Sequence, residues 1–340
     1  MRFQYESKLM DVNPLEPKEL KIGVLTGLRY SAKSCLSANF TMQKVRFRFS
    51  NYWLPSVWSS VLVFVSLGVC AADTTVVRHN FYDDQKSETL NYKGEVLALI
   101  LEKSKAKYGP YVMKKGPQID WSQSRAYSQL ERGELDLIAS QTSHAREQAG
   151  LPVRYCLYKG LLGIRIGMGT RDTVAALERM QNRAELDRVK LGQVFDWPDY
   201  AIQTEAGLQV VRLTNVASSI ERLKSGSFQL LPLGIVEVAP IAQKYGLHTV
   251  STWAIAYPTA YYFFVTKKRP ELAERLSYGF EQAIRDGSFD ALFARRLEPL
   301  VAAAGLQKRK LFRIENPYLP AATPLGRKEL WHSLLSTVLQ

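Results

Sequence analysis

One pattern of hydrophobic and polar positions explains more of this chain than any other. Over residues 217–238, ASSIERLKSGSFQLLPLGIVEV, apolar positions with helical spacing stop just before Gly226. A short apolar run at 228–231 then predicts a buried strand, and a second helix is expected from Ile235. A glycine can take the left-handed conformation that ends a helix at little cost. The pattern therefore predicts a helix–glycine–strand unit.

The same phrase occurs earlier in the chain, at residues 125–140, with the sequence RAYSQLERGELDLIAS. When the two copies are aligned, Gly133 matches Gly226 and Asp136 matches Gln229. Two units of this kind in one register predict two similar α/β lobes and argue against one continuous domain.

Strands and helices alternate through most of the remaining chain. Two apolar segments, 156–168 and 257–266, have the length and composition of strands that cross between lobes. Alternation on both sides of two crossings predicts an α/β fold, with two Rossmann-like, parallel-sheet lobes joined by a two-strand hinge. Further strands are expected at 74–79, 111–113, 189–195 and 210–211, and helices at 94–108, 173–187, 270–286, 289–304 and 327–339.

The two crossings divide the chain that follows the N-terminal segment. The first lobe is predicted to be discontinuous, comprising residues 73–163 and 265–340 with the C-terminal tail, and the second to comprise 164–264. Ligands bind beyond the carboxyl ends of the strands in sheets of this kind. One interlobe cleft is therefore expected, and it is lined by residues 80–84, 140–142, 196–199 and 233–234.

The N-terminal segment has the features of a secretory signal. Basic residues precede the apolar run 53–69, and small residues close it, so residues 42–72 are interpreted as a signal peptide and the location as periplasmic. The run is shorter than the roughly 20 residues that a membrane-spanning helix needs. A lipoprotein modified at Cys70 is the alternative, although Val69 fits a lipobox poorly. Residues 1–41 are interpreted as an unstructured upstream extension.

Composition and charge indicate a globular protein and argue against a nucleic-acid-binding function. The 340 residues are 46% hydrophobic, which suits a globular chain of about two domains. The formal net charge of +13 is not concentrated in one block, and its densest run, at 308–310, lacks interleaved aromatic residues. A solvated surface explains this run better than a nucleic-acid patch, so no nucleic-acid partner is expected.

No pattern in the sequence points to catalysis. The four histidines have no metal-type spacing, and we find neither a Gly-x-Ser-x-Gly motif nor a phosphate-binding loop. Cys156, the one cysteine beyond residue 72, lies among aromatic and apolar neighbours and is interpreted as a core thiol. We predict no catalytic residue, no metal and no cofactor.

Two phrases carry a resemblance to a known family. LERGELDLIASQTSHARE and YYFFVTKKRPELAERLSYGFEQAIRDGSFDALFAR resemble the type II periplasmic solute-binding proteins, above all those of polar amino-acid ABC transporters. YKGLLGIR and DWPD look typical of a divergent branch often found without an obvious transporter. The resemblance implies a monomer that closes by hinge motion on a small polar, amino-acid-like solute. An ABC permease or a sensor kinase would be its partner.

In the first lobe, the resemblance assigns the ligand α-carboxylate to Arg146. This arginine follows the strand end that carries Ser140 and Thr142. A guanidinium group suits a planar carboxylate because it makes two parallel charge-assisted hydrogen bonds. The alternative is a surface arginine paired with Glu147.

The second lobe departs from the family pattern. Asp196-Trp197 stands where relatives place Gly-Thr facing the carboxylate, so Asp196 is interpreted as a helix N-cap or as facing a cationic group. Trp197 either stacks on a ligand or packs at an interface. Gly234 replaces the ammonium-binding aspartate, and Glu237 can substitute only if the backbone turns it toward the cleft. The complete set of predicted ligand-binding residues is Asn80, Tyr82, Asp84, Ser140, Thr142, Arg146, Arg165, Asp196, Trp197, Gly234 and Glu237.

Two other functional classes remain open at this point. One is an enzyme on the same fold, resembling periplasmic cyclohexadienyl dehydratase. The other is a sensory module that presents its ligand to a separate membrane kinase. An aromatic product from prephenate or arogenate would identify the first, and a membrane partner the second.

Overall fold

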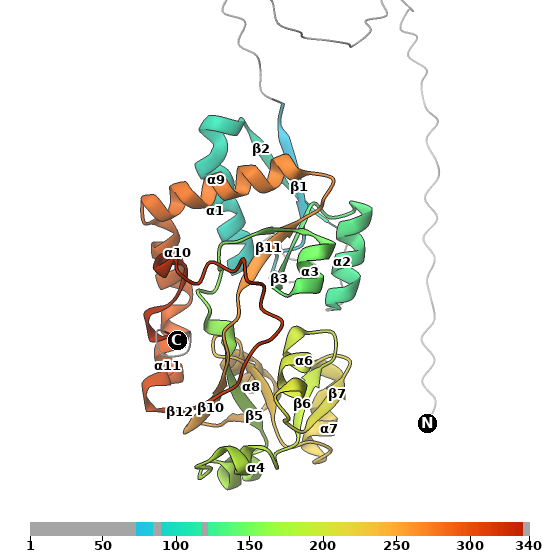
Figure 1. Ribbon diagram of the computed structural model, residues 1–340, viewed down its shortest axis with the longest axis vertical. Coiled ribbons are helices and arrows are strands. Elements are labelled where there is room, and N and C mark those ends of the chain that lie inside the picture. Colours follow the sequence, from blue (N-terminus) through green and yellow to red (C-terminus); the bar gives the residue numbers. More distant parts are fainter. Residues whose placement is uncertain (1–72, 84–89, 117–121, 336–340) are drawn as a thin grey trace, which may run out of the picture. The chain divides into compact units, whose positions relative to one another are not determined.

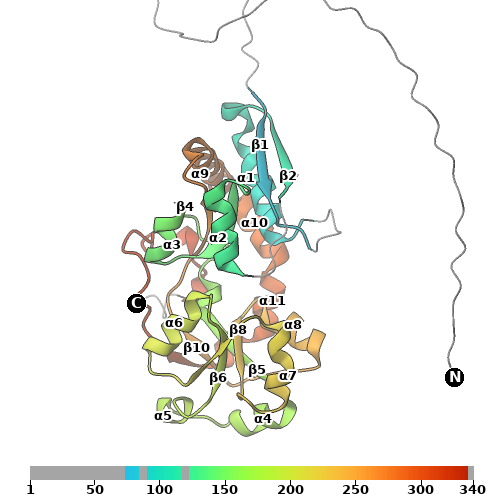
Figure 2. The ribbon, with the colours of Figure 1, turned by 90° about the vertical axis from the view of Figure 1, so that its right-hand side faces the viewer.

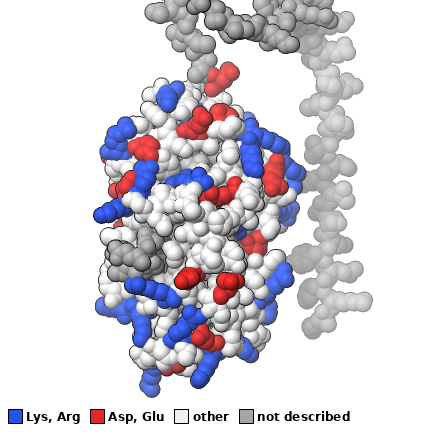
Figure 3. Space-filling view, viewed as in Figure 1, with Lys and Arg blue, Asp and Glu red and all other residues white. Residues whose placement is uncertain are grey.

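The computed structural model describes residues 73–83, 90–116 and 122–335, which form two α/β lobes (Figure 1). The upstream extension, the signal peptide and Cys70 lie outside the described residues, as does Asp84. Within the described part of the chain, no helix is both long and apolar enough to cross a membrane. Basic and acidic side chains are interspersed over both lobes on the face shown in Figure 3.

The first lobe has a two-stranded sheet, β1-β2, and a three-stranded sheet, β3-β11-β4, which lie next to each other with β1 beside β3. Strands β1 and β2 are parallel, whereas β11 runs antiparallel to β3 and β4. The backbone N–H of Asp136, just before β3, donates to the carbonyl of Arg78 in β1 at 3.0 Å and links the two sheets. The elements of this lobe are β1 (Thr75–His79), α1 (Tyr92–Tyr108), β2 (Tyr111–Lys115), α2 (Gln123–Arg132), β3 (Leu137–Gln141), α3 (His144–Ala149), β4 (Leu151–Val153), β11 (Tyr261–Val265), α9 (Pro270–Arg285) and α10 (Ser288–Arg296).

Helices α1 and α9 cover one face of these sheets and pack directly on each other (Figure 1). The Asn91 side chain caps α1 by accepting from the backbone N–H groups of Lys93 and Gly94. A Cβ atom on Gly279 of α9 would lie 2.0 Å from the carbonyl oxygen of Ile100 in α1. The close approach of the two helices therefore requires glycine at position 279.

The second lobe has a sheet with the order β12-β10-β5-β8, and β6 and β7 extend it. A bridge between Leu191 and Leu230 links β6 to the segment before β8. Strand β5 runs antiparallel to β8 and β10, so the strands of this lobe, like those of the first, are not purely parallel as predicted. Its elements are β5 (Ile164–Gly169), α4 (Arg171–Leu177), α5 (Arg183–Leu186), β6 (Leu191–Val194), α6 (Pro198–Glu205), β7 (Val210–Leu213), α7 (Ile220–Lys224), β8 (Leu231–Gly234), α8 (Val238–Tyr245), β9 (His248–Thr249), β10 (Trp253–Ala256) and β12 (Lys310–Arg313).

The predicted repeat has the same hydrogen bonds in both lobes. Gly133 and Gly226 both adopt left-handed backbone angles, with φ of 77° and 78°. After Gly133, the N–H of Glu134 donates to the carbonyl of Gln129 at 2.9 Å. After Gly226, the N–H of Ser227 donates to that of Arg222, also at 2.9 Å. The glycine-ended helix therefore closes in the same way in each copy.

The match between Asp136 and Gln229 is also confirmed. The N–H of Asp136 binds the carbonyl of Arg78, and that of Gln229 binds the carbonyl of Lys190. Each side chain makes a second hydrogen bond to the same neighbour. Asp136 accepts from the N–H of Arg78 at 2.7 Å, and Gln229 accepts from the N–H of Lys190 at 2.9 Å. Each copy thus connects to the neighbouring strand through one backbone and one side-chain hydrogen bond.

Several element boundaries differ from the predictions. The strand expected at 228–231 is β8 at Leu231–Gly234, and the helix expected from Ile235 begins at Val238. The shift arises because the segment before β8 first binds Lys190 and Leu191, so pairing with β5 starts only at Leu231. The crossing strand expected over 156–168 likewise begins only at Ile164, after a run of turns.

Three predicted helices are shorter or absent among the described residues. The segment 173–187 forms α4 and α5, because the Asn182 side chain caps a new helix. The segment 289–304 breaks at Leu297, ahead of Pro299, into α10 and α11 (Glu298–Ala304). The segment 328–335 contains only short 3₁₀ turns, which bury Trp331 and Leu335.

The C-terminal tail contacts both lobes. Lys310–Arg313, which the sequence assigned to the first lobe, forms β12 and pairs with β10 in the second. The chain then returns, and the N–H of His332 donates to the carbonyl of Lys159 at 2.9 Å (Figure 1). The two predicted crossings are therefore accompanied by α11 and by this returning tail.

Candidate functional site

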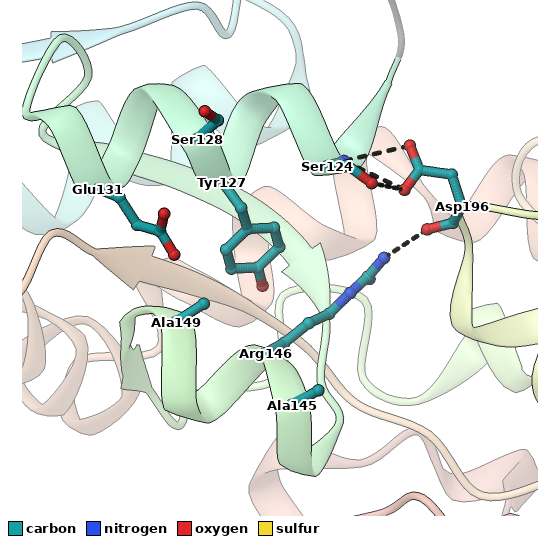
Figure 4. Close-up of a pocket in the computed structure, with 8 residues that line it drawn as sticks. All are labelled: Ser124, Tyr127, Ser128, Glu131, Ala145, Arg146, Ala149 and Asp196. Carbon is teal, nitrogen blue, oxygen red and sulfur yellow. Dashed lines mark hydrogen bonds between the residues drawn. The ribbon is translucent and has the colours of Figure 1, made fainter.

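Arg146 lies where α3 of the first lobe faces the second lobe (Figure 4). Its Nη1 donates to the Ser140 hydroxyl at 2.7 Å and to the Gln141 carbonyl at 3.0 Å. Its Nη2 crosses to the second lobe and donates to the Asp196 carbonyl at 2.9 Å. The guanidinium also lies over the Tyr127 ring, 5.6 Å from its centroid. Three hydrogen bonds thus commit this guanidinium to the protein itself.

The Asp196 carboxylate makes the reciprocal connection to the start of α2. It accepts from the Ser124 N–H at 3.1 Å, from the Ser124 hydroxyl at 2.5 Å and from the Ser122 hydroxyl at 3.0 Å. Partial burial opposes ionisation, but these hydrogen bonds outweigh it and lower the pKa of Asp196. We call Arg146, Asp196, Ser122 and Ser124 the interlobe clasp.

The clasp corrects one prediction about Asp196. The N-cap of α6 is Trp197, which makes no side-chain capping bond, and Pro198 occupies the first helical position. Asp196 therefore does not cap its own helix as expected. Its carboxylate instead satisfies donors at the first turn of α2 in the other lobe.

A pocket of about 340 Å³ opens beside the clasp, between α2 and α3 (Figure 4). Its lining combines an aromatic ring, small side chains and charged groups of both signs, namely Ser124, Tyr127, Ser128, Glu131, Ala145, Arg146, Ala149 and Asp196. The Tyr127 hydroxyl is buried and has no hydrogen-bond partner within the described residues.

A second arginine, Arg165, is buried at the start of β5. It forms an ion pair with Asp199 of α6, and each side chain is only 3% exposed. The Tyr257 hydroxyl donates to the same Asp199 oxygen, and the side-chain oxygen of Gln141 accepts from Arg165 at 3.3 Å. Burial alone would lower the pKa of Arg165, but the charge of Asp199 and its neighbours outweighs burial and raises it. This guanidinium remains charged throughout the accessible pH range.

The backbone turns at Glu237, so that its side chain returns to the end of β8. The N–H of Glu237 donates to the Gly234 carbonyl at 2.7 Å, and this turn brings the glutamate back over β8. Its Oε2 accepts from the Gly234 N–H at 3.1 Å and lies 3.9 Å from Arg165 Nη1. A Cβ atom on Gly234 would be 2.7 Å from that oxygen, so Glu237 occupies the space that a side chain at 234 would need.

Other predicted residues are less closely gathered. The Thr142 hydroxyl donates to Glu147 at 2.9 Å, and Arg154 binds the other oxygen of Glu147 at 2.5 Å. Glu147 therefore does not pair with Arg146, as the alternative interpretation required. Trp197 is half-buried and packs against the core, and its Nε1 is buried with no partner in the described part of the chain.

Two predicted residues follow β1 at the edge of the first lobe. Tyr82 stacks on the buried His79, with ring centroids 5.1 Å apart, and Lys115 lies over its ring. Asn80 is half-buried. Both residues therefore lie beside β1, and the neighbours of the Tyr82 ring there include His79 and Lys115.

Sequence reasoning missed several polar side chains around Arg165. Asp199 belongs to the segment 196–199 that was expected to line the cleft, but nothing in the sequence marked Tyr257 as its partner. Buried polar atoms without a partner in the described residues also gather here and in the adjacent sheet: Gln141 Nε2, Arg165 Nε, Gln193 Nε2, Trp197 Nε1 and both amide atoms of Gln203. Glutamines inside otherwise apolar strands were the available signal.

No group of three or more His, Cys, Asp or Glu side chains in the described ranges is arranged to hold a metal ion. Cys156 is buried, and burial raises the pKa of its thiol to about 11. What the arrangement around Arg165 offers chemically is charge and hydrogen bonding, from Arg165, Glu237 and the neighbouring amide side chains.

Comparisons with known proteins identify the fold. No protein-family model and no curated protein sequence matches the chain. Three similar solved structures share a TM-score of 0.50, and each alignment covers 66% of this chain.

The first is a Silicibacter pomeroyi periplasmic His/Glu/Gln/Arg/opine family-binding protein in complex with lysine, at 11% identity and 97% coverage of that chain. The second is an arginine-specific periplasmic binding protein of Salmonella typhimurium, at 10% identity and full coverage. The third is the VFT2 domain of Bordetella pertussis BvgS, at 15% identity and 92% coverage. The chain has the two-lobed α/β fold of the type II periplasmic solute-binding proteins.

Proposed function

We propose that this chain is a periplasmic solute-binding protein that closes by hinge motion on a small polar, amino-acid-like solute. An ABC permease or a sensor kinase would then read the closed form. The observation that carries the proposal is the interlobe clasp, in which side chains of one lobe bind the other lobe directly. These hydrogen bonds would stabilise a closed arrangement of the two lobes.

Hinge closure requires a difference in binding between the open and the closed form. A ligand that contacts one lobe only would bind equally to both forms and would not shift the equilibrium between them. Gln141 belongs to the first lobe, whereas Arg165, Gln193 and Gln203 belong to the second. Each has a buried polar atom that finds no partner among the described residues. A polar solute that satisfies atoms from both lobes would stabilise the closed form.

The solved structures with this fold support the chemical class of the solute. Two of the three are described as binding basic amino acids, namely lysine and arginine. In the present chain, acidic side chains lie near the hinge at Asp199 and Glu237, together with the basic Arg165. This mixture of charges suits a solute that carries both an ammonium and a carboxylate group.

The experiment combines ligand identification with a measurement of size. Native mass spectrometry of freshly purified protein would reveal a co-purified small molecule, and titration with free amino acids would confirm it. Small-angle scattering should then show a smaller radius of gyration in the liganded than in the ligand-free protein. An unchanged radius with a confirmed ligand would contradict hinge closure.

A further inference from the structure

Lys93 stands apart from the other interior cations of the chain. It lies in the first turn of α1 and is half-buried, with its ammonium 5.8 Å from the centroid of the Phe81 ring. Within the described residues its ammonium makes no hydrogen bond and no ion pair. Burial lowers the pKa of Lys93, and the charge of Glu237 opposes that shift.

Other lysines of the first lobe show that such isolation is avoidable. Lys159 is similarly buried, but it pairs with Asp290 at 2.6 Å, and Lys103 pairs with Asp286. A half-buried ammonium without a partner lowers stability, because desolvation of its charge is not offset. An arrangement that lowers stability is expected where the group serves binding.

Glu237, in the second lobe, is the acidic residue whose charge acts on Lys93. Its Oε2 is held by the Gly234 N–H, whereas no hydrogen bond to its Oε1 occurs within the part of the chain that the structure describes. The Glu237 side chain remains 38% exposed, so it is reachable by solvent. Lys93 and Glu237 do not form an ion pair with each other, although the charge of Glu237 raises the pKa of Lys93 against the effect of burial.

We infer that Lys93 and Glu237 form a dipolar ligand site, in which Lys93 binds the anionic group of the solute and Glu237 binds its cationic group. The inference rests on the proposed function and assigns its substrate class by residue. It moves anion recognition away from Arg146, whose guanidinium is committed to Ser140, Gln141 and Asp196.

The placement of the two groups explains why such a ligand would favour closure. Lys93 belongs to α1 in the first lobe, and Glu237 precedes α8 in the second. Tyr158 and Tyr261, which lie within the two predicted crossing segments, are also within electrostatic range of Glu237. A solute joined to both charged groups therefore connects the lobes next to the hinge, and its opposite charges neutralise two groups that the protein leaves apart.

The test compares free L-amino acids with their carboxamides and their N-acetyl derivatives, using calorimetric titration of the full chain. Wild-type protein should bind at least one free amino acid and prefer it to both derivatives. Lys93→Met removes the charge and keeps most of the side-chain length. We expect it to weaken binding of the free amino acid by about 10- to 100-fold, as for loss of a hydrogen bond to a charged group, and to leave carboxamide binding unchanged.

Two further variants complete the comparison. Glu237→Gln should lose the preference for the free amino acid over its N-acetyl derivative, because the derivative lacks the ammonium group. Lys105→Met is the matched control on the same helix, since Lys105 is exposed and pairs only with Glu102 at 3.4 Å. It should bind like the wild type.

Stability gives an independent readout of the role of Lys93. Because burial lowers the pKa of Lys93, Lys93→Met should unfold at the same or a higher temperature than the wild type. A marked fall in unfolding temperature would assign Lys93 a structural role and overturn the site.

The binding outcomes separate the two proposals. Wild-type protein that binds no free amino acid overturns the proposed function together with the site. Wild-type protein that binds one, with Lys93→Met retaining the same preference for acid over carboxamide, overturns the site alone.

Discussion

Two arginine–aspartate arrangements lie close together in this molecule and differ in what they connect. In the clasp, Arg146 of the first lobe binds the main chain of Asp196, and the Asp196 carboxylate binds the start of α2. In the second arrangement, Arg165 pairs with the carboxylate of Asp199, and both groups are buried in the second lobe. Only two residues separate Asp196 from Asp199, yet Asp196 serves the lobe interface and Asp199 the interior of a lobe.

The difference indicates which contacts of a hinged molecule stay fixed within a lobe and which can open when the lobes move. A buried ion pair cannot be opened cheaply, because separating its members leaves an uncompensated charge in a poorly solvated place. The clasp uses a half-buried carboxylate, a half-buried guanidinium, two serine hydroxyls and backbone groups, which exchange their partners for water at a small net cost. Motion between the lobes is therefore expected to break the clasp and to leave the Arg165–Asp199 pair intact.

The largest expected effect comes from breaking the buried pair. Asp199→Asn keeps the size of the side chain but leaves the Arg165 charge uncompensated, and it weakens the contact with Tyr257. We expect the free energy of unfolding to fall by about 3–5 kcal/mol. Urea unfolding followed by circular dichroism would measure it.

The matched control for this variant is an exposed pair in the same lobe. Asp187 and Arg183 form an ion pair one helical turn apart, and both side chains are about two-fifths exposed, at 42% and 40%. Asp187→Asn should therefore change stability by only a few tenths of a kcal/mol. Equal effects of the two substitutions would show that burial does not distinguish the two pairs.

Acidification should remove the stability contributed by His79, an unrelated buried group, and leave the clasp intact. Burial lowers the pKa of His79 to about 4, so the folded protein favours its neutral form. The stability that neutral His79 contributes is fully present above its ordinary pKa of 6.5. It is lost as the pH falls toward 4, and the free energy of unfolding then decreases by about 3 kcal/mol in total. The clasp should survive this window, because the lowered pKa of Asp196 keeps its carboxylate ionised there.

The measurement is urea unfolding at several pH values between 7 and 4. His79→Asn retains an acceptor for the Phe81 N–H and removes the titrating ring, so its stability should be nearly constant over this range. If His79→Asn loses stability as steeply as the wild type, another group is responsible for the loss.

Local pattern was sufficient to predict much of the fold. The glycine after each amphipathic helix placed both repeat units, and the equivalence of Asp136 and Gln229 extended to their hydrogen bonds. These features depend on residues close in sequence. The position of β12 was not predicted, because its pairing with β10 is a contact between distant segments.

The basic run at 308–310 was interpreted as solvated surface, and the structure corrects this in part. Arg309 is half-buried, and its Nε donates to the carbonyl of Ala304 at 2.7 Å. Its guanidinium also reaches the carbonyl of Trp253 at 3.4 Å. A charge run in a sequence does not reveal which of its members will meet unpaired carbonyl groups.

The candidate site was harder to predict for the same reason. Asp196 was expected to cap the helix that follows it, but its partners Ser122 and Ser124 are more than 70 residues earlier in the chain. Lys93 gave no signal at all, because a lysine near a helix start is usually solvated. Its isolation becomes visible only when its tertiary surroundings are known.

The smallest expected effect, and the most informative for hinge motion, comes from removing the clasp carboxylate. Asp196→Ala leaves the Ser124 donors at the start of α2 without their acceptor, while the bond from Arg146 to the residue-196 carbonyl remains available. Loss of a helix-capping carboxylate lowers unfolding free energy by about 1 kcal/mol. Because this bond joins the lobes, the ligand-free variant should also show a larger radius of gyration by small-angle scattering than the wild type. Ser124→Ala removes one of the same bonds and should act in the same direction with a smaller effect. A radius that stays at the wild-type value in both variants would mean that the clasp follows lobe closure and does not help to hold it.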